Sequence, residues 1–152
     1  MKKCLLCLVL ISITLLSIVG CKKESEVEYY KISFEGSDIT PGQKINLDKI
    51  KKGYDKSEVT DCAFGEKGIV YTFEDLEIST NEDGLIYSVY FISSNMKTTE
   101  GVSLGDEKSK INKNYSECVE DDETLKCSKG RVEIDFNINN DSISGIRYIL
   151  LD

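Results

Sequence analysis

The sequence of 152 residues contains no histidine and a single proline, Pro41. Without histidine, neither a Ser-His-Asp nor a Cys-His catalytic arrangement can be built, and a frequent zinc ligand is missing. Glycine-rich phosphate loops are absent as well, because Gly65, Gly68 and Gly84 occur singly rather than as GxGxxG or GxxxxGK. The DxDxDG pattern of a calcium loop does not occur either. We therefore expect no enzyme activity, no metal centre and no cofactor.

The N-terminus carries the one long uncharged run, which extends from Cys4 to Val19 after the basic residues Lys2 and Lys3. A basic start, an apolar stretch and a small residue at its end are typical of a secretory signal peptide. The alternative is a permanent transmembrane helix, but the run is shorter than the roughly 20 residues that a bilayer core requires. We predict a signal peptide over residues 1–20.

The residues Ile18-Val19-Gly20-Cys21 resemble the lipobox of bacterial lipoproteins. The resemblance implies cleavage between Gly20 and Cys21 and a diacylglyceryl group on the Cys21 sulfur. Each buried methylene adds about 0.8 kcal/mol of membrane affinity, so two acyl chains hold a domain firmly. The alternative is an ordinary disulfide or core thiol at Cys21. We expect a lipidated Cys21, a polar tether to residue 28, and a location on the extracellular side of the cell membrane.

Basic residues are scarce in the expected mature chain. Removing residues 1–20 deletes Lys2 and Lys3 from 19 basic residues, which leaves 17 against 27 acidic ones and a net charge of −10. Binding to phosphate backbones requires clustered lysine and arginine. We therefore expect no nucleic-acid partner.

Three cysteines remain in the folded part, Cys62, Cys118 and Cys127. A tight turn at Asp122-Glu123 would place Cys118 and Cys127 directly opposite each other on a hairpin. Such cross-strand geometry permits a disulfide, although the sequence does not show whether it forms. An odd number of cysteines leaves at least one without an intrachain partner, and we assign that position to Cys62.

Internal similarity indicates two copies of one unit. The segment IYSVYFI at 86–92 matches ISGIRYI at 143–149 with a spacing of 57, and LDKIKKGY matches KSKINKNY with a spacing of 61. A longer loop in the first copy, DKSEVTD, accounts for most of the difference between the spacings. The alternative is that any two alternating strands look alike.

Each unit is predicted to be a short helix followed by antiparallel strands. Ile50 and Tyr54 in the first unit, and Ile111 and Tyr115 in the second, have the four-residue spacing of one helix face. The segment 132–138 alternates strictly between apolar and polar residues, which predicts a strand, and NNDS at 139–142 predicts a turn. We predict an α+β fold of two tandem helix-then-antiparallel-sheet repeats, 29–96 and 97–152, in one compact unit.

This order of elements resembles the tandem-repeat fold of the beta-lactamase inhibitor protein family and of the SmpA/OmlA-type outer-membrane lipoproteins. Residues 98–115 look like a repeat of unassigned lipoproteins of clostridia and related low-GC Gram-positive bacteria. In the inhibitor family, open sheet faces grip a partner protein. The resemblance implies a non-enzymatic surface module that binds a protein or envelope partner. It transfers no binding residue, because no motif defines that surface.

Two residues are candidates for a partner-contact face. Tyr90 and Arg147 occupy matching positions in the two copies, both out of phase with the expected core residues, and aromatic and arginine side chains are frequent interface anchors. The alternative for Tyr90 is strand propensity alone.

Two alternative functions and two carboxylate clusters complete the predictions from the sequence. A small-ligand lipoprotein associated with a transporter, and an immunity or inhibitor lipoprotein, are alternative functions. The carboxylate clusters 121–123 and 74–77 are predicted to be solvated surface rather than a site.

Overall fold

A small N-terminal hairpin and one large sheet dominate the fold, which a computed structural model describes over residues 28–60 and 67–151. The predicted signal peptide with Gly20, the predicted lipidation site Cys21 and the spare thiol Cys62 lie outside these residues. Within them, no helix is long and apolar enough to cross a membrane. The elements are β1 (Ile32–Phe34), β2 (Ser37–Ile39), η1 (Leu47–Lys49), β3 (Asp55–Thr60), β4 (Lys67–Thr72), β5 (Leu76–Asn81), β6 (Ile86–Phe91), α2 (Lys108–Asn114), β7 (Cys118–Asp121), β8 (Thr124–Lys129), β9 (Val132–Asn139) and β10 (Ser142–Leu150).

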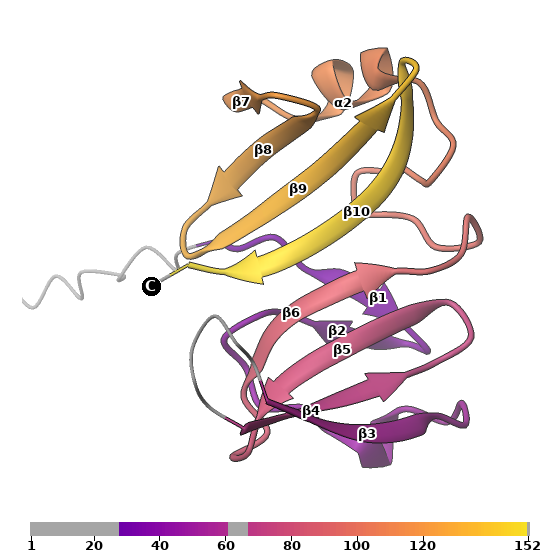
Figure 1. The fold of residues 1–152 in the computed structure, drawn as a ribbon, viewed down its shortest axis with the longest axis vertical. Coiled ribbons are helices and arrows are strands. Elements are labelled where there is room, and N and C mark those ends of the chain that lie inside the picture. Colours follow the sequence, from indigo (N-terminus) through magenta and orange to yellow (C-terminus); the bar gives the residue numbers. More distant parts are fainter. Residues whose placement is uncertain (1–27, 61–66, 152) are drawn as a thin grey trace, which may run out of the picture.

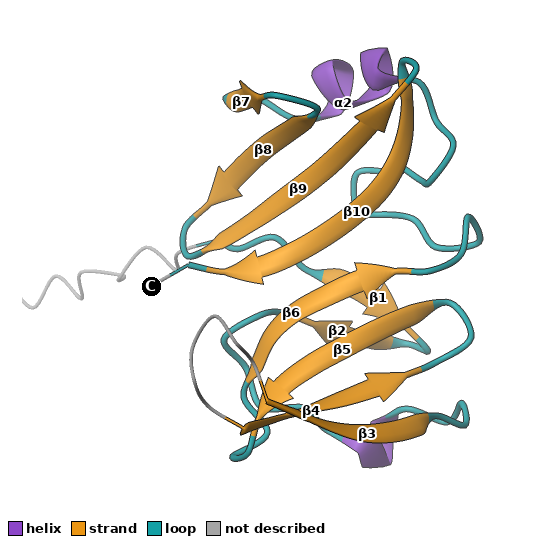
Figure 2. Cartoon of the chain, in the orientation of Figure 1, coloured by secondary structure: helices purple, strands orange, loops and turns teal. Residues whose placement is uncertain are grey.

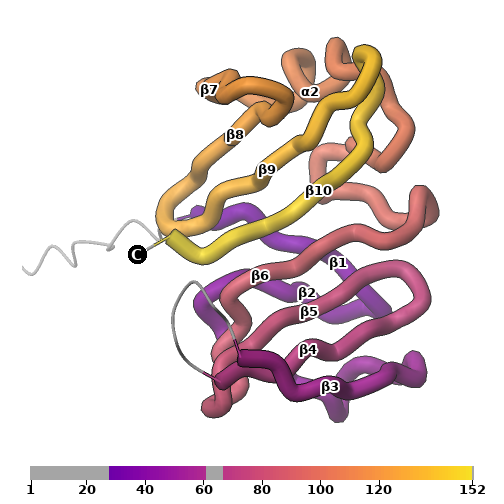
Figure 3. Tube along the Cα trace, viewed as in Figure 1, coloured from indigo at the N-terminus to yellow at the C-terminus, as the bar shows by residue number. Residues whose placement is uncertain are grey.

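The large sheet has eight antiparallel strands in the order β3-β4-β5-β6-β10-β9-β8-β7. Each half is a four-stranded meander, and the last strands of the two meanders, β6 and β10, pair in the middle (Figures 1 and 3). The first strands of the meanders, β3 and β7, are therefore the two edges. This arrangement brings residues far apart in the sequence into direct cross-strand contact, for example Val89 opposite Tyr148, 59 positions away.

Local sequence explains the strands and their turns. In β9, apolar residues alternate with polar ones, and the apolar residues Val132, Ile134 and Phe136 are fully buried. The predicted turn after β9 is confirmed, because Asn139 pairs with Ser142 across a two-residue loop. Asn140 and Asp141 in that loop both have positive φ, which is typical of a type I′ hairpin turn.

One face of the sheet is covered and carries the core. The covering layer consists of the β1–β2 hairpin, the segment 92–107 and α2, as Figure 2 shows with the hairpin behind the sheet. Its buried apolar residues include Ile32, Met96, Val102 and Ile111, and they join the core-facing residues of β4 to β10 in one cluster. The opposite face of the sheet has no such layer among the described residues. Antiparallel sheets commonly have one packed and one solvated face.

The predicted α+β class with two helix-then-sheet repeats is wrong. The protein is mostly β, eight of the ten strands in the described residues form one continuous sheet, and α2 is the one α-helix there. The helix expected around Ile50 and Tyr54 is replaced by the three-residue 3-10 turn η1, after which Ile50 is extended. Asn46 forms no side-chain cap for this turn, and Gly53 disfavours continuation of a helix.

The expected loop DKSEVTD is also wrong in part, because Asp55–Thr60 forms the edge strand β3. Its side chains are almost all exposed, so the strand lacks the apolar alternation that would have revealed it. Charged residues on an edge strand oppose pairing with another chain. The polar sequence of β3 is therefore consistent with its place at the edge.

Candidate functional site: the open face of the sheet

A continuous row of side chains crosses the open face, one from each strand. Its middle part, the central row, consists of Lys126, Asp135, Arg147, Tyr90 and Glu77, in that order across β8, β9, β10, β6 and β5. Each residue is the direct cross-strand partner of the next. Adjacent strands lie about 4.8 Å apart, so neighbouring side chains of the row are within reach of each other.

The two predicted contact residues meet at the centre of this row. Tyr90 of β6 and Arg147 of β10 are direct cross-strand partners, at the junction of the two meanders. Tyr90 is 38% exposed and the Arg147 side chain is 53% exposed. An exposed tyrosine next to an exposed arginine provides an aromatic surface and hydrogen-bond donors at one place.

Asp135 is the unusual member of the central row. Alternation with Ile134 and Phe136 turns its side chain to the open face, yet that side chain is only 9% exposed between Lys126 and Arg147. Its Oδ2 accepts a hydrogen bond from Arg147 Nη2 at 3.2 Å. Its Oδ1 has no hydrogen-bond partner among the described residues. A buried carboxylate oxygen without a donor is costly, and it is a site where an external donor would be favourable.

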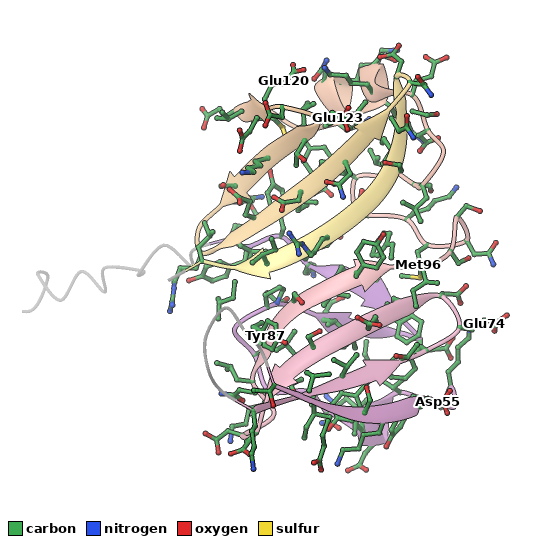
Figure 4. The ribbon with its side chains drawn as sticks, viewed as in Figure 1. Asp55, Glu74, Tyr87, Met96, Glu120 and Glu123 are labelled. Atoms are coloured by element: carbon green, nitrogen blue, oxygen red, sulfur yellow. A yellow bond between two sulfur atoms is a disulfide. The ribbon has the colours of Figure 1, made fainter. Side chains whose placement is uncertain are left out.

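Glu77 ends the central row on the other side of Tyr90. Its side chain is half-buried and forms no ion pair or hydrogen bond with any described residue. A second tyrosine of β6, Tyr87, also lies over the first meander, as Figure 4 shows, but farther along the strands, where Gly68 pairs with Asn81. Its hydroxyl is close to Gly68 of β4, where a Cβ atom would lie 3.6 Å from it. Glu77 thus presents, beside Tyr90, a carboxylate that no described residue pairs with.

The open face is acidic overall. Among the described residues, strand alternation and register place five carboxylates and two cations on this face, which gives a net charge of −3. The carboxylates are Asp55, Glu77, Asp121, Glu133 and Asp135, and the cations are Lys126 and Arg147. Lys126 binds Asp121, which lowers the pKa of Asp121 and raises that of Lys126, chiefly through their shared hydrogen bond. Lys126 is therefore already paired with a carboxylate, and the net charge of the face is negative.

A disulfide joins Cys118 of β7 to Cys127 of β8. The two cysteines are direct cross-strand partners, and the strands turn at Asp122-Glu123. Cys127 of β8 is fully buried, whereas the residues of β7 after Cys118 are exposed. The disulfide thus links the exposed edge strand β7 covalently to a buried position of β8.

The two carboxylate clusters have different environments. Asp121 to Glu123 form an exposed hairpin tip, as expected. In the other cluster Asp75 is buried, where its Oδ2 accepts a hydrogen bond from Lys52 Nζ at 2.6 Å and its Oδ1 one from Asn95 at 3.4 Å. The hydrogen bond from Lys52 holds the pKa of Asp75 below its usual value. Asp75 is an anchor of the covering layer rather than part of a site.

An open hollow of about 740 Å³ lies on the other side of the molecule, between β2 and the segment 43–50. Its lining includes Asp38, Lys44, Asn46 and Lys49, so it is largely polar. A receptor for a small ligand usually has an enclosed, mostly apolar pocket. This hollow does not have that character.

The sequence predicted Tyr90 and Arg147 as contact residues and Glu77, in the carboxylate cluster 74–77, as solvated surface, and it did not mark Asp135. Alternation along β9 indicated that Asp135 faces outward, but its burial results from neighbours on two other strands. The positions of Lys126 and Arg147 beside it follow from register, which the sequence does not show.

Comparisons with known proteins give a distantly similar solved structure and nothing on function. No protein-family model matches the chain, and no curated protein matches it. A solved structure described as the uncharacterized protein yfeY from Escherichia coli is similar, with a TM-score of 0.46 and 15% identity over 72% of this chain and 90% of that chain. A similarity of this size transfers no function.

Proposed function

We propose that this protein is a lipid-anchored, non-enzymatic surface protein that binds a partner protein through the open face of its sheet. The observation that carries the proposal is that Tyr90 and Arg147 are cross-strand partners at the centre of an eight-stranded face that no layer of residues 28–60 and 67–151 covers. Aromatic and arginine side chains contribute most of the binding energy at many protein interfaces. The lipobox-like sequence around Cys21 supports attachment to the outside of the cell membrane.

Photo-crosslinking in the native cells tests the partner-binding role. A benzophenone amino acid is placed at position 90, at position 147 and, as the matched control, at position 54. Tyr54 is 42% exposed, close to the value for Tyr90, but its ring packs on Tyr71 and Phe73 away from the open face. We expect the same discrete protein adduct from positions 90 and 147 and none from position 54. No adduct from the face, or one adduct from all three positions, would refute the proposal.

A separate measurement tests the anchor. The intact mass and the detergent partitioning of the protein are compared between the wild type and Cys21→Ala. We expect a mature mass that starts at Cys21 and includes a diacylglyceryl group, and loss of both the lipid and the detergent partitioning in the variant. An unmodified chain that still carries residues 1–20 would contradict the lipoprotein part of the proposal.

A further inference from the structure

We propose that the central row binds a basic segment of the partner protein, with one cationic side chain at Glu77 and Tyr90 and a second donor at Asp135. This inference rests on the proposed function and specifies the chemistry of the partner. It starts from two acceptors that the described part of the protein leaves unused, the Glu77 carboxylate and Asp135 Oδ1.

The Glu77 end suits a guanidinium or ammonium group. Glu77 and Tyr90 are direct cross-strand partners, so a cation on the exposed face of the Tyr90 ring can also reach the carboxylate. A cation over an aromatic ring gains about 0.5 to 2 kcal/mol, depending on its desolvation.

The Asp135 end supplies independent evidence for a ligand. Its side chain is more than nine-tenths buried, points to the open face, and keeps one oxygen without a donor. Arg147 contacts the other oxygen through a single 3.2 Å hydrogen bond and is itself half exposed, so its side chain can move aside. A donor from outside that reached Oδ1 would complete the hydrogen bonding of this carboxylate.

The charge of the face selects the kind of occupant. A net charge of −3 over the open face opposes a second copy of the same chain, and it equally opposes nucleic acid or an anionic lipid surface. A basic protein segment is complementary to it. Glu77 and Asp135 are separated by three strand spacings, about 14 Å, which equals the span of an extended segment between residues four positions apart.

The probe is a fluorescent heptapeptide with two arginines separated by three small neutral residues. Its affinity is measured by fluorescence anisotropy for the full lipidated protein in nanodiscs of neutral phosphatidylcholine. The same peptide with citrulline in place of arginine keeps the shape and removes the charge. The variants are Glu77→Gln and Asp135→Asn, and the matched control is Glu82→Gln, which removes one charge from an exposed turn outside the central row.

We expect citrulline, Glu77→Gln and Asp135→Asn each to weaken binding by about tenfold or more, as loss of a charge-assisted hydrogen bond does, and Glu82→Gln to change it less than twofold. Equal binding of the citrulline peptide, an equal loss in Glu82→Gln, or no binding of the arginine peptide would overturn the inference. Glu77 is only half-buried, so we expect Glu77→Gln to stay folded. This variant therefore tests the inference even if Asp135→Asn unfolds.

The crosslinking experiment separates this inference from the proposed function. An adduct at position 90 that persists unchanged in Glu77→Gln and Asp135→Asn would leave partner binding intact and refute the basic segment. Absence of any adduct from the face would instead refute the proposed function itself.

Discussion

Reduction of the Cys118–Cys127 disulfide should destabilise the whole fold by a measurable amount. The bond closes a loop with a sequence separation of 9. The loss of chain entropy in the unfolded state then amounts to about 2.6 kcal/mol at 25 °C. This value is a large share of the roughly 5 to 15 kcal/mol that stabilises a typical domain.

The expected change in melting temperature follows from the size of the protein. An unfolding entropy of about 2.1 cal/mol/K per residue over roughly 120 ordered residues gives about 0.25 kcal/mol per degree. Reduction should therefore lower Tm by about 10 °C. The assay is thermal unfolding followed by circular dichroism, with and without a phosphine reductant, on the same wild-type protein, so that no side chain changes.

Two controls make this result interpretable. Mass analysis after alkylation must show that Cys118 and Cys127 become reactive in the reduced sample. Urea unfolding should show a lower midpoint with a slope that is the same or slightly steeper, because opening the short loop lets the unfolded chain expose the same or slightly more surface. Complete reduction with a Tm shift under 2 °C would refute the reasoning, since it would mean that β7 separates before the rest of the sheet unfolds.

Three further predictions concern stability. Gly68→Ala should lower the free energy of unfolding in urea by about 1 to 3 kcal/mol, because the added Cβ would lie 2.9 Å from the Thr80 carbonyl oxygen. Gly53→Ala adds a Cβ with nothing within 4 Å, so it should be neutral or slightly stabilising, and equal effects of the two substitutions would contradict this explanation. Phe136→Ala should cost about 3 to 5 kcal/mol because the ring is fully buried, and a loss below 1 kcal/mol would show that the core refills the space. The pKa of Asp75 is lower in the folded state, so the stabilisation by its carboxylate is present above the unfolded pKa of about 4 and is lost as the pH falls. The difference in unfolding free energy between wild type and Asp75→Asn should therefore shrink from pH 7 to pH 3, and a constant difference would refute this prediction.

Strong local patterns predicted parts of this fold correctly. The alternation in β9 and the turn residues after it gave the strand and its hairpin, because both depend on neighbouring residues only. The exposed edge strand β3 has no apolar alternation, and it forms because β4 offers unpaired backbone groups beside it. The expected first helix failed for a related reason: an apolar spacing of four residues did not outweigh Gly53 and the absence of a cap.

In the candidate site, too, the sequence indicated some residues and not others. The spacing of 57 residues identified Tyr90 and Arg147 as equivalent positions, and the structure places them opposite each other. Asp135 and Glu77 could not be recognised, because the burial of one and the free carboxylate of the other depend on which strands become neighbours.

The central pairing of β6 with β10 also has a consequence for biogenesis. β6 ends at Phe91, whereas β10 begins at Ser142. During synthesis or export, about fifty further residues must therefore emerge before the edge of β6 finds its partner. Throughout that interval the first meander exposes a strand with free backbone groups and the buried residues Val89 and Phe91. Such an edge can pair with the wrong chain, so the newly made protein needs either rapid delivery of its second half or a chaperone that shields β6.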